Sequence, residues 1–449
     1  MKVAGCELCE PVTIVARLRS LLAAVALDLG LLRRRSQLRL LMGAVSVSLM
    51  GSMVTFVALP LQVYNLTRST FAVGLLGLAE LVPILALALI AGALADTVDR
   101  RKLLLVADFV ATGASAGLVA NASLTHPRVW VLFAGALFLA GCDAVRRPPQ
   151  DALIPTLVGR EELKAAAAIE FVAFNVAQIA GPALGGVLIA LAGYRSTYVV
   201  DAACFMVSFA LITRLRPPAT AKGAASPQRG ESARLLDLGA ILEGARYARS
   251  RPELVGTYVV DIAAMLLAIP FAVLPAIAAG HGGASTAGLL FAAPAIGSLL
   301  AALTSGWTRH VRRHGRAVVI AAIGWGLGVA LFGLAGSVAL GVICLALAGG
   351  ADSISGIFRA TIWNETIPAH LRGRLAGIEM LSWSSGPTLG NARAGLTASL
   401  FGVRQSVVAG GLACVGACAA LATAIPGFWH YAPEPRAEGT TSAADADGL

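Results

Sequence analysis

The sequence contains little charge for its length. Only 13% of its 449 residues are Asp, Glu, Lys or Arg, whereas 57% are apolar, and the mean hydropathy is +0.77. Soluble domains contain about 25% charged residues. A soluble chain of this size could not bury so much apolar surface, so the sequence predicts an integral membrane protein.

Several motifs of other functional classes are missing. No Gly-x-x-x-x-Gly-Lys-Ser/Thr stretch is present, which argues against direct ATP hydrolysis, and Gly-x-Ser-x-Gly is absent, which argues against a lipase-like site. No His/Asp/Glu cluster has metal-ligand spacing. The net charge of +10 comes from loops without interleaved aromatics, so we expect no nucleic-acid binding. We therefore expect neither an enzyme nor a cofactor.

The seven cysteines do not suggest a metal or disulfide framework. Cys6 and Cys9 form a CxxC pair without a second pair nearby, so we do not expect a zinc or redox site, and their role stays open. The other five fall in apolar runs, where we expect small buried side chains: Cys142, Cys204, Cys344, Cys414 and Cys418.

Apolar runs of about 20 residues, enough to cross a bilayer, recur along the chain. No short apolar core with a cleavage site precedes the first run, which we expect to be an anchor itself. We predict an all-α protein with twelve spans: 38–60, 71–94, 103–122, 129–146, 165–191, 196–214, 254–279, 286–307, 317–335, 338–358, 375–399 and 405–426. The predicted parts are a tail with an amphipathic helix (1–37), two six-helix halves (38–214 and 253–430), a linker (215–252) and a disordered tail (431–449).

The distribution of Lys and Arg predicts the orientation. With the N-terminus inside, cytoplasmic segments hold 30 of these residues and outer loops hold 4. Cytoplasmic loops of membrane proteins carry the excess of positive charge. We therefore expect both termini in the cytoplasm.

A short polar hinge separates the second and third spans. Gly92 could end a helix, and Asp96 could accept hydrogen bonds from the backbone N–H groups that open the next one. Asp99 and the basic pair Arg100 and Arg101 would hold this loop on the cytoplasmic side. A weaker copy lies at 306–316.

The hinge is one of four correspondences between the halves. GPALG at 181–185 matches GPTLG at 386–390, AGYRS at 192–196 matches FGVRQ at 401–405, and GCD at 141–143 matches GAD at 350–352. Six spans separate each pair, so the halves have the same orientation, as in one known plan of transporters. The glycines and prolines of the first pair would permit close helix approach: Gly181, Pro182, Gly185, Gly386, Pro387 and Gly390.

These features resemble the major facilitator superfamily, although Thr97 and Asp99 depart from its hinge signature. The segments ALPLQVY (58–64), GALADTVDRR (92–101), AGPALGG (180–186) and GRLAG (373–377) resemble its enterobactin-exporter branch. So do Asp261 with 264–265 and the stretch 387–395. The resemblance implies proton-driven export of siderophores or drug-like amphiphiles. Relatives often carry a charge where Phe271 stands, which leaves the substrate open.

Charged residues inside spans are the main candidates for function, because a charge at the bilayer centre costs about 2.5–3.5 kcal/mol on insertion scales. Glu80 and Asp261 could exchange protons, Asp261 being the first choice because seventh helices line the cavity in the resembling fold. Glu80 could equally be a protonated structural group. Arg393 could bind an anionic substrate or, as the preferred alternative, pair with an acid such as Asp261. Asp201 is expected to pair near the outer surface with Arg195 or Arg404.

A second group is predicted to form a cytoplasmic gate. Asp143 and Asp352 occupy matching positions and are followed by Arg146 and Arg359, and we favour gate pairs with the hinge over transport chemistry. Glu379 would join the gate through Arg372 or Arg374. The polar residues Asn175 and Gln178 could line the cavity or bond across helices.

The sequence thus predicts a secondary transporter of the bacterial inner membrane that exports a small amphiphile in exchange for protons. Its expected partners are the substrate, protons and the lipid bilayer, and we expect a monomer. The alternatives are a proton-coupled importer of a small metabolite and a transport-inactive sensor or assembly partner.

Overall fold

The computed structural model describes residues 30–216, 243, 246–368 and 371–432, and the regular structure of these residues is entirely helical. The CxxC pair and the amphipathic helix expected in the N-terminal tail lie outside the described residues, apart from the end of that helix. Most of the linker and the end of the C-terminal tail also lie outside them.

The N-terminal half consists of long helices. They are α2 (Gly30–Arg34), α3 (Ser36–Thr67), α4 (Thr70–Thr97), α5 (Arg100–Ala122), α6 (Val129–Leu157) and α7 (Leu163–Arg214), with a 3₁₀ turn η1 (Arg160–Glu162). The 52-residue α7 contains two spans, because Gly193 interrupts it with φ 75° and ψ 177°. A residue with a Cβ rarely adopts such a conformation.

The C-terminal half repeats this plan. Its elements are α9 (Pro252–Ala268), η4 (Phe271–Val273), α10 (Leu274–Ala279), α11 (Ala284–Leu303), η5 (Ser305–His310), α12 (His314–Leu334), α13 (Val338–Thr366), α14 (Arg372–Phe401), α15 (Val403–Ala424) and α16 (Pro426–Trp429). The seventh span is therefore interrupted after α9 and resumes in α10. The predicted end of the eighth span at 307 is wrong, because α11 ends at Leu303 and a 3₁₀ turn follows.

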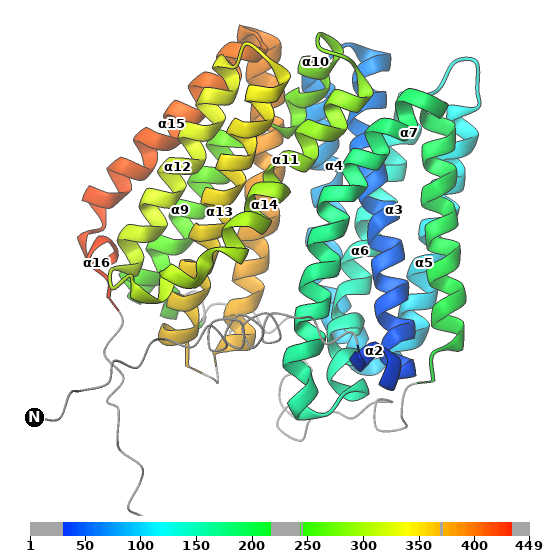
Figure 1. The fold of residues 1–449 in the computed structure, drawn as a ribbon, viewed down its shortest axis with the longest axis horizontal. Coiled ribbons are helices and arrows are strands. Elements are labelled where there is room, and N and C mark those ends of the chain that lie inside the picture. Colours follow the sequence, from blue (N-terminus) through cyan, green and yellow to red (C-terminus); the bar gives the residue numbers. More distant parts are fainter. Residues whose placement is uncertain (1–29, 217–242, 244–245, 369–370, 433–449) are drawn as a thin grey trace, which may run out of the picture.

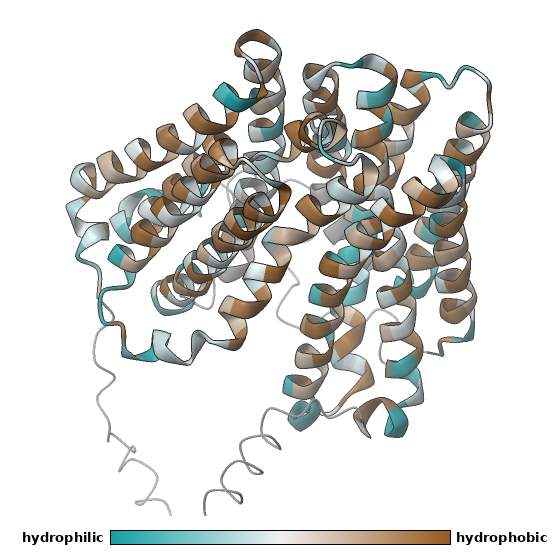
Figure 2. Ribbon diagram, turned by 45° about the horizontal axis from the view of Figure 1, so that its top comes forward, coloured by the Kyte–Doolittle hydropathy of each residue, from teal (hydrophilic) through white to brown (hydrophobic). Residues whose placement is uncertain are grey.

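Ten helical stretches of the described residues are long and apolar enough to cross a membrane. One of them, Arg160–Arg214, holds the two spans on either side of Gly193, and the 30-residue α14 supplies the remaining one. The arrangement is the predicted all-α fold with two six-helix halves. Hydrophobic residues make up much of the length of the helices (Figure 2), and Phe109, Leu191 and Leu347 are 66–83% exposed, as expected of groups that face lipid.

The internal repeat is visible in the backbone. Gly402, which matches Gly193, also has a positive φ (95°) and separates α14 from α15. The two Gly-Pro-x-x-Gly segments make equivalent contacts as well. Gly181 lies against Met53 of α3, and Gly386 lies against Met265 of α9. The motifs therefore pack the fifth and eleventh spans against the first helix of their own halves.

The two halves contact each other through two equivalent helix crossings. In Figure 1 they converge where α10, α11 and α7 meet and spread apart toward the end that carries α2 and α16. Gly186 of α7 faces Gly288 of α11, and Gly74 of α4 faces Gly395 of α14. A Cβ on Gly288 would lie 2.5 Å from the carbonyl oxygen of Pro182 and 3.0 Å from the Cα of Gly186. Backbone against backbone thus forms the contact.

Replacement of one glycine at this crossing should destabilise the protein. We expect Gly288→Ala to cost about 1–3 kcal/mol through overpacking and to lower the melting temperature of the purified protein in detergent. Gly117→Ala is the matched control, because a Cβ there meets nothing within 4 Å and alanine favours a helix. Equal melting temperatures for the two variants would contradict the close backbone contact.

Candidate functional site

A small cavity of about 40 Å³ lies between the halves, where α3 and α4 meet η4, α11 and α14. Glu80 of α4 lines it, and among the described residues that do so it is the one with an ionisable side chain. The lining residues are Phe56, Leu59, Pro60, Val73, Leu76, Gly77, Glu80, Phe271, Ala272, Phe291 and Asn391. The acidic residue that the sequence analysis identified within the second span therefore faces a space shared by both halves.

Three aromatic rings from both halves form one wall of this cavity. Phe271 and Phe291 are stacked, with centroids 5.6 Å apart and an interplanar angle of 16°. Phe56 of the N-terminal half meets them edge-on at 6.0 and 5.5 Å. Offset and edge-to-face contacts are the preferred arrangements of aromatic pairs. The wall also contains Phe271, which the sequence analysis singled out.

Asp261 lies in a buried ion pair and not at the cavity wall. On α9 it is 9% exposed and pairs with Arg359 of α13. Arg359 also lies 3.7 Å from Asp352, and Glu379 of α14 interacts electrostatically with both Arg359 and Asp261. The side chains of Arg372 and Arg374, expected to pair with Glu379, lie outside the described residues. The structure thus joins Asp261 and Asp352 around one arginine, with Glu379 close enough for electrostatic interaction.

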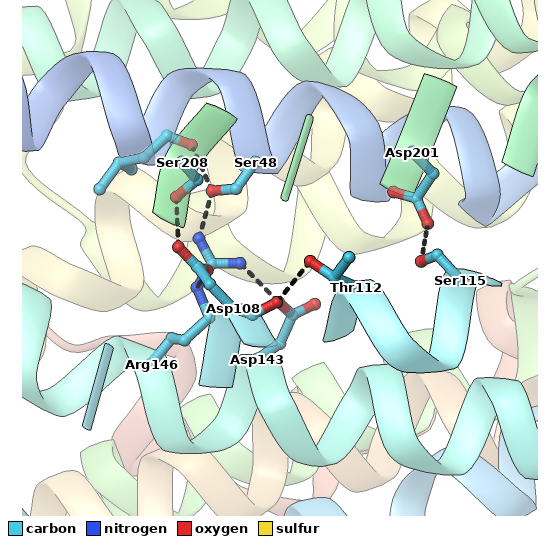
Figure 3. Close-up of polar contacts among 9 residues, drawn as sticks. Ser48, Asp108, Thr112, Ser115, Asp143, Arg146, Asp201 and Ser208 are labelled. Atoms are coloured by element: carbon cyan, nitrogen blue, oxygen red, sulfur yellow. Dashed lines mark hydrogen bonds and ion pairs between the residues drawn. The ribbon is translucent and has the colours of Figure 1, made fainter. Parts of the chain in front are cut away.

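An equivalent cluster lies in the N-terminal half (Figure 3). The Arg146 guanidinium lies 3.3 Å from Asp108 of α5 and 3.6 Å from Asp143, and it donates to the hydroxyl of Ser48 on α3. Ser208 of α7 donates to the second Asp108 oxygen at 2.6 Å. Each of the two clusters stays within its own half. The ion pairs of Asp143 and Asp352 are with Arg146 and Arg359, whereas we had expected pairs with the hinge.

The sequence analysis overlooked Asp108. This residue is fully buried in α5. It satisfies the criterion that selected Glu80, a lone acidic residue within an apolar span, and applying that criterion to all spans would have found it.

Arg393 does not pair with Asp261, so that prediction was wrong. Its guanidinium donates to the carbonyl oxygens of Leu266 (3.1 Å) and Leu267 (2.6 Å). These carbonyls belong to the last turn of α9, which stops at Ala268 and leaves them without intrahelical partners. Arg393 therefore caps the interrupted seventh span.

The expected pairing of Asp201 at the outer surface was also wrong. Asp201 is completely buried and accepts a hydrogen bond from the Ser115 hydroxyl at 2.7 Å (Figure 3). A hydroxyl on the neighbouring α5 reaches it inside the half, whereas Arg195 lies beside the interruption of α7 at Gly193 and Arg404 lies in the first turn of α15.

The hinge differs from the prediction in its capping residue. The helix α4 continues through Gly92 to Thr97, and Asp99 is the residue that caps α5 by accepting from the N–H of Arg101 at 2.9 Å. The side chain of Asp96 lies outside the described residues. The cap belongs at position 99 because α5 begins at Arg100.

The two arginines of the hinge bind the ends of neighbouring helices. Arg100 donates to the carbonyl of Ala152 in α6 at 3.2 Å, and Arg101 donates to those of Ile212 (3.1 Å) and Thr213 (2.5 Å) in α7. Helix C-termini attract cations. The hinge therefore holds three helices of one half together.

The polar residues of the fifth span lie apart from both charge clusters. Asn175 is buried and donates to the carbonyl of Phe171, one turn earlier in α7, at 2.8 Å. This bond is within its own helix and not across helices, as one alternative had it. Gln178 is half-buried on the same helix.

Two halves that share a cavity inside a twelve-span bundle define a membrane transporter. Solved structures agree on the fold. A bacterial homologue of the human lysosomal transporter Spinster, in an inward-facing and unoccupied conformation, has a TM-score of 0.69 at 16% identity and covers 89% of this chain and 99% of its own. The nucleoside transporter NupG has a TM-score of 0.68 at 14% identity, with coverage of 88% and 99%.

Sequence comparison gives the family. Residues 32–441 match the family described as transmembrane secretion effectors, so the chain belongs to this family of major facilitator transporters. Similar curated proteins include the enterobactin exporter EntS of Citrobacter koseri, 31% identical over 87% of this chain and 92% of the relative. The enterobactin exporter EntS of Salmonella typhi is 30% identical over 87% and 93%. The predicted resemblance is confirmed.

The structure predicts unequal effects for the two acids beside Arg146. Asp108→Asn removes the charge of a fully buried partner and should cost about 3 kcal/mol, because it leaves the buried guanidinium poorly compensated. Asp143→Asn is the control; its side chain is 55% exposed, so we expect a loss below about 1 kcal/mol. Melting of both purified variants in detergent measures the difference. A larger loss for Asp143→Asn would contradict the assignment.

Proposed function

We propose that the protein exports a small amphiphilic molecule across the bacterial inner membrane by alternating access, in exchange for protons. Both termini would lie in the cytoplasm, and one chain would be the working unit. The observation that carries this proposal is the cavity lined by both halves with Glu80 in its wall. The family of secretion effectors and the similarity to enterobactin exporters support export over import.

The packing between the halves suits a rocking motion. At the two glycine crossings the halves meet through backbone surfaces, and the charged clusters around Arg146 and Arg359 remain within their halves. Each half can then rotate without separating a buried ion pair, which would cost several kcal/mol. The predicted gate residues would act at the inner ends of the helices by keeping each half rigid.

Asp261 is our first candidate for proton coupling. When its carboxylate takes up a proton, its ion pair with Arg359 weakens, and Arg359 keeps Asp352 and Glu379 as partners. Such an exchange of partners around one arginine alters the contact between α9 and α13. A ligand or proton shifts a conformational equilibrium by its differential affinity for the two states.

The direction of transport distinguishes the proposal from an importer. Cells that express the protein should accumulate less of a fluorescent amphiphile or siderophore than cells without it, and an uncoupler should remove the difference. Accumulation that rises with expression and falls with the uncoupler would show import instead. The absence of any flux difference across a panel of compounds would favour a transport-inactive role.

Neutralising Asp261 should abolish proton-driven efflux without reducing the amount of protein in the membrane. The substitution Asp261→Asn keeps the size of the side chain and removes the group that binds the proton. Glu253→Gln is the control, because Glu253 lies in the first turn of the same helix, beside the half-exposed Arg251. Efflux assays in membrane vesicles with an imposed proton gradient, and immunoblots for abundance, check this. Normal efflux in Asp261→Asn would remove Asp261 from the coupling mechanism.

A further inference from the structure

We propose that the cavity around Glu80 selects planar aromatic molecules that carry a positive charge. This proposal rests on the proposed export function and names its substrate class. It follows from three properties of the cavity wall: its carboxyl group, its aromatic surface and its amide donor.

The ionisable group of the wall is acidic. Glu80 faces the cavity, and none of the described residues that line it is basic. Three arginines of the membrane-spanning helices are engaged elsewhere. Arg393 binds the carbonyls at the end of α9, and Arg146 and Arg359 pair with acids of their own halves. A carboxylate in a partly buried space is most favourable when an opposite charge accompanies it, so a cation gains and an anion loses there.

The aromatic wall adds a second attraction for the same class. Phe271 and Phe291 stack on each other, and Phe56 closes the group from the opposite half. Aromatic ligands can stack on or meet the edges of such rings, and a cation above a ring face gains about 0.5–2 kcal/mol. Because the three rings come from both halves, a bound ligand would contact both moving parts.

A polar contact completes the description. Asn391 fixes its carboxamide by accepting from the N–H of Ala272 at 3.1 Å, so its NH₂ group is a hydrogen-bond donor of known orientation at the wall. The wall thus offers one carboxyl group, one amide donor and three aromatic rings.

The test compares two dyes of the same ring system and opposite charge. Fluorescence anisotropy of the purified full-length protein, at about pH 8.5 so that carboxylates lose their protons, should show at least about tenfold tighter binding of cationic rhodamine 6G than of anionic fluorescein. Tenfold corresponds to about 1.4 kcal/mol. Tighter binding of fluorescein would overturn the proposal.

Variants assign the selectivity to the wall. Glu80→Gln should weaken rhodamine 6G about tenfold without weakening fluorescein, and Glu80→Asp should keep the preference for the cation. Phe271→Leu should weaken both dyes about fivefold, because it removes a ring and keeps apolar volume. Glu170→Gln is the control; this half-buried acid of α7 bonds Gln150 and does not line the cavity. Unchanged rhodamine binding in Glu80→Gln, with a normal melting temperature, would overturn the proposal.

Transport in proteoliposomes separates this inference from the function on which it rests. Export of rhodamine 6G but not fluorescein supports both. Export of anionic compounds alone would overturn the substrate class and leave the exporter intact. Selective binding of rhodamine 6G with no transport of either dye would keep the binding site and remove the export function.

Discussion

The cost of burying charge in a bilayer determines how this protein is built. Arg146 and Arg359 lie inside the helical bundle, and each is compensated by two aspartates of its own half. If the halves move as proposed, a pair that joined them would have to break, at a cost of several kcal/mol. Neither arginine cluster spans the boundary, so the motion would leave both clusters intact.

The boundary is held instead by contacts that are individually weak and geometrically specific. Backbone approaches at Gly186 with Gly288 and at Gly74 with Gly395 replace side-chain bonds, and the Thr70 hydroxyl donates to the Gly395 carbonyl at 3.0 Å. Lipid provides no hydrophobic force between helices, so close packing has to hold them together. Small residues permit that packing because they let the backbones approach. The cavity shares α4, α11 and α14 with these crossings, which places it next to the contact that would have to open in the proposed transport cycle.

Much of this architecture was predictable from the sequence, because length, hydropathy and the internal repeat are properties of single segments. The matched glycines at 193 and 402 show that the repeat extends to backbone angles. The binding partners of the charged side chains were less predictable. An acidic partner was preferred for Arg393 because a buried cation usually pairs with an anion. The interruption of the seventh span, however, presents carbonyl oxygens without helical partners, which only the three-dimensional structure reveals. Asp108 was missed although its isolation in an apolar span was visible.

The two predicted carboxylates differ in a way that bears on how transport and selectivity can be divided. Asp261 lies against an arginine that has a further acidic neighbour, so a change in its protonation would be answered by a rearrangement between α9 and α13. Glu80 lies against apolar and aromatic groups at a shared wall, so its carboxyl group would act on whatever enters the cavity. If one carboxylate served both purposes, any change of substrate charge would also change the coupling. Separate positions would allow the cavity wall to change without disturbing the arginine clusters.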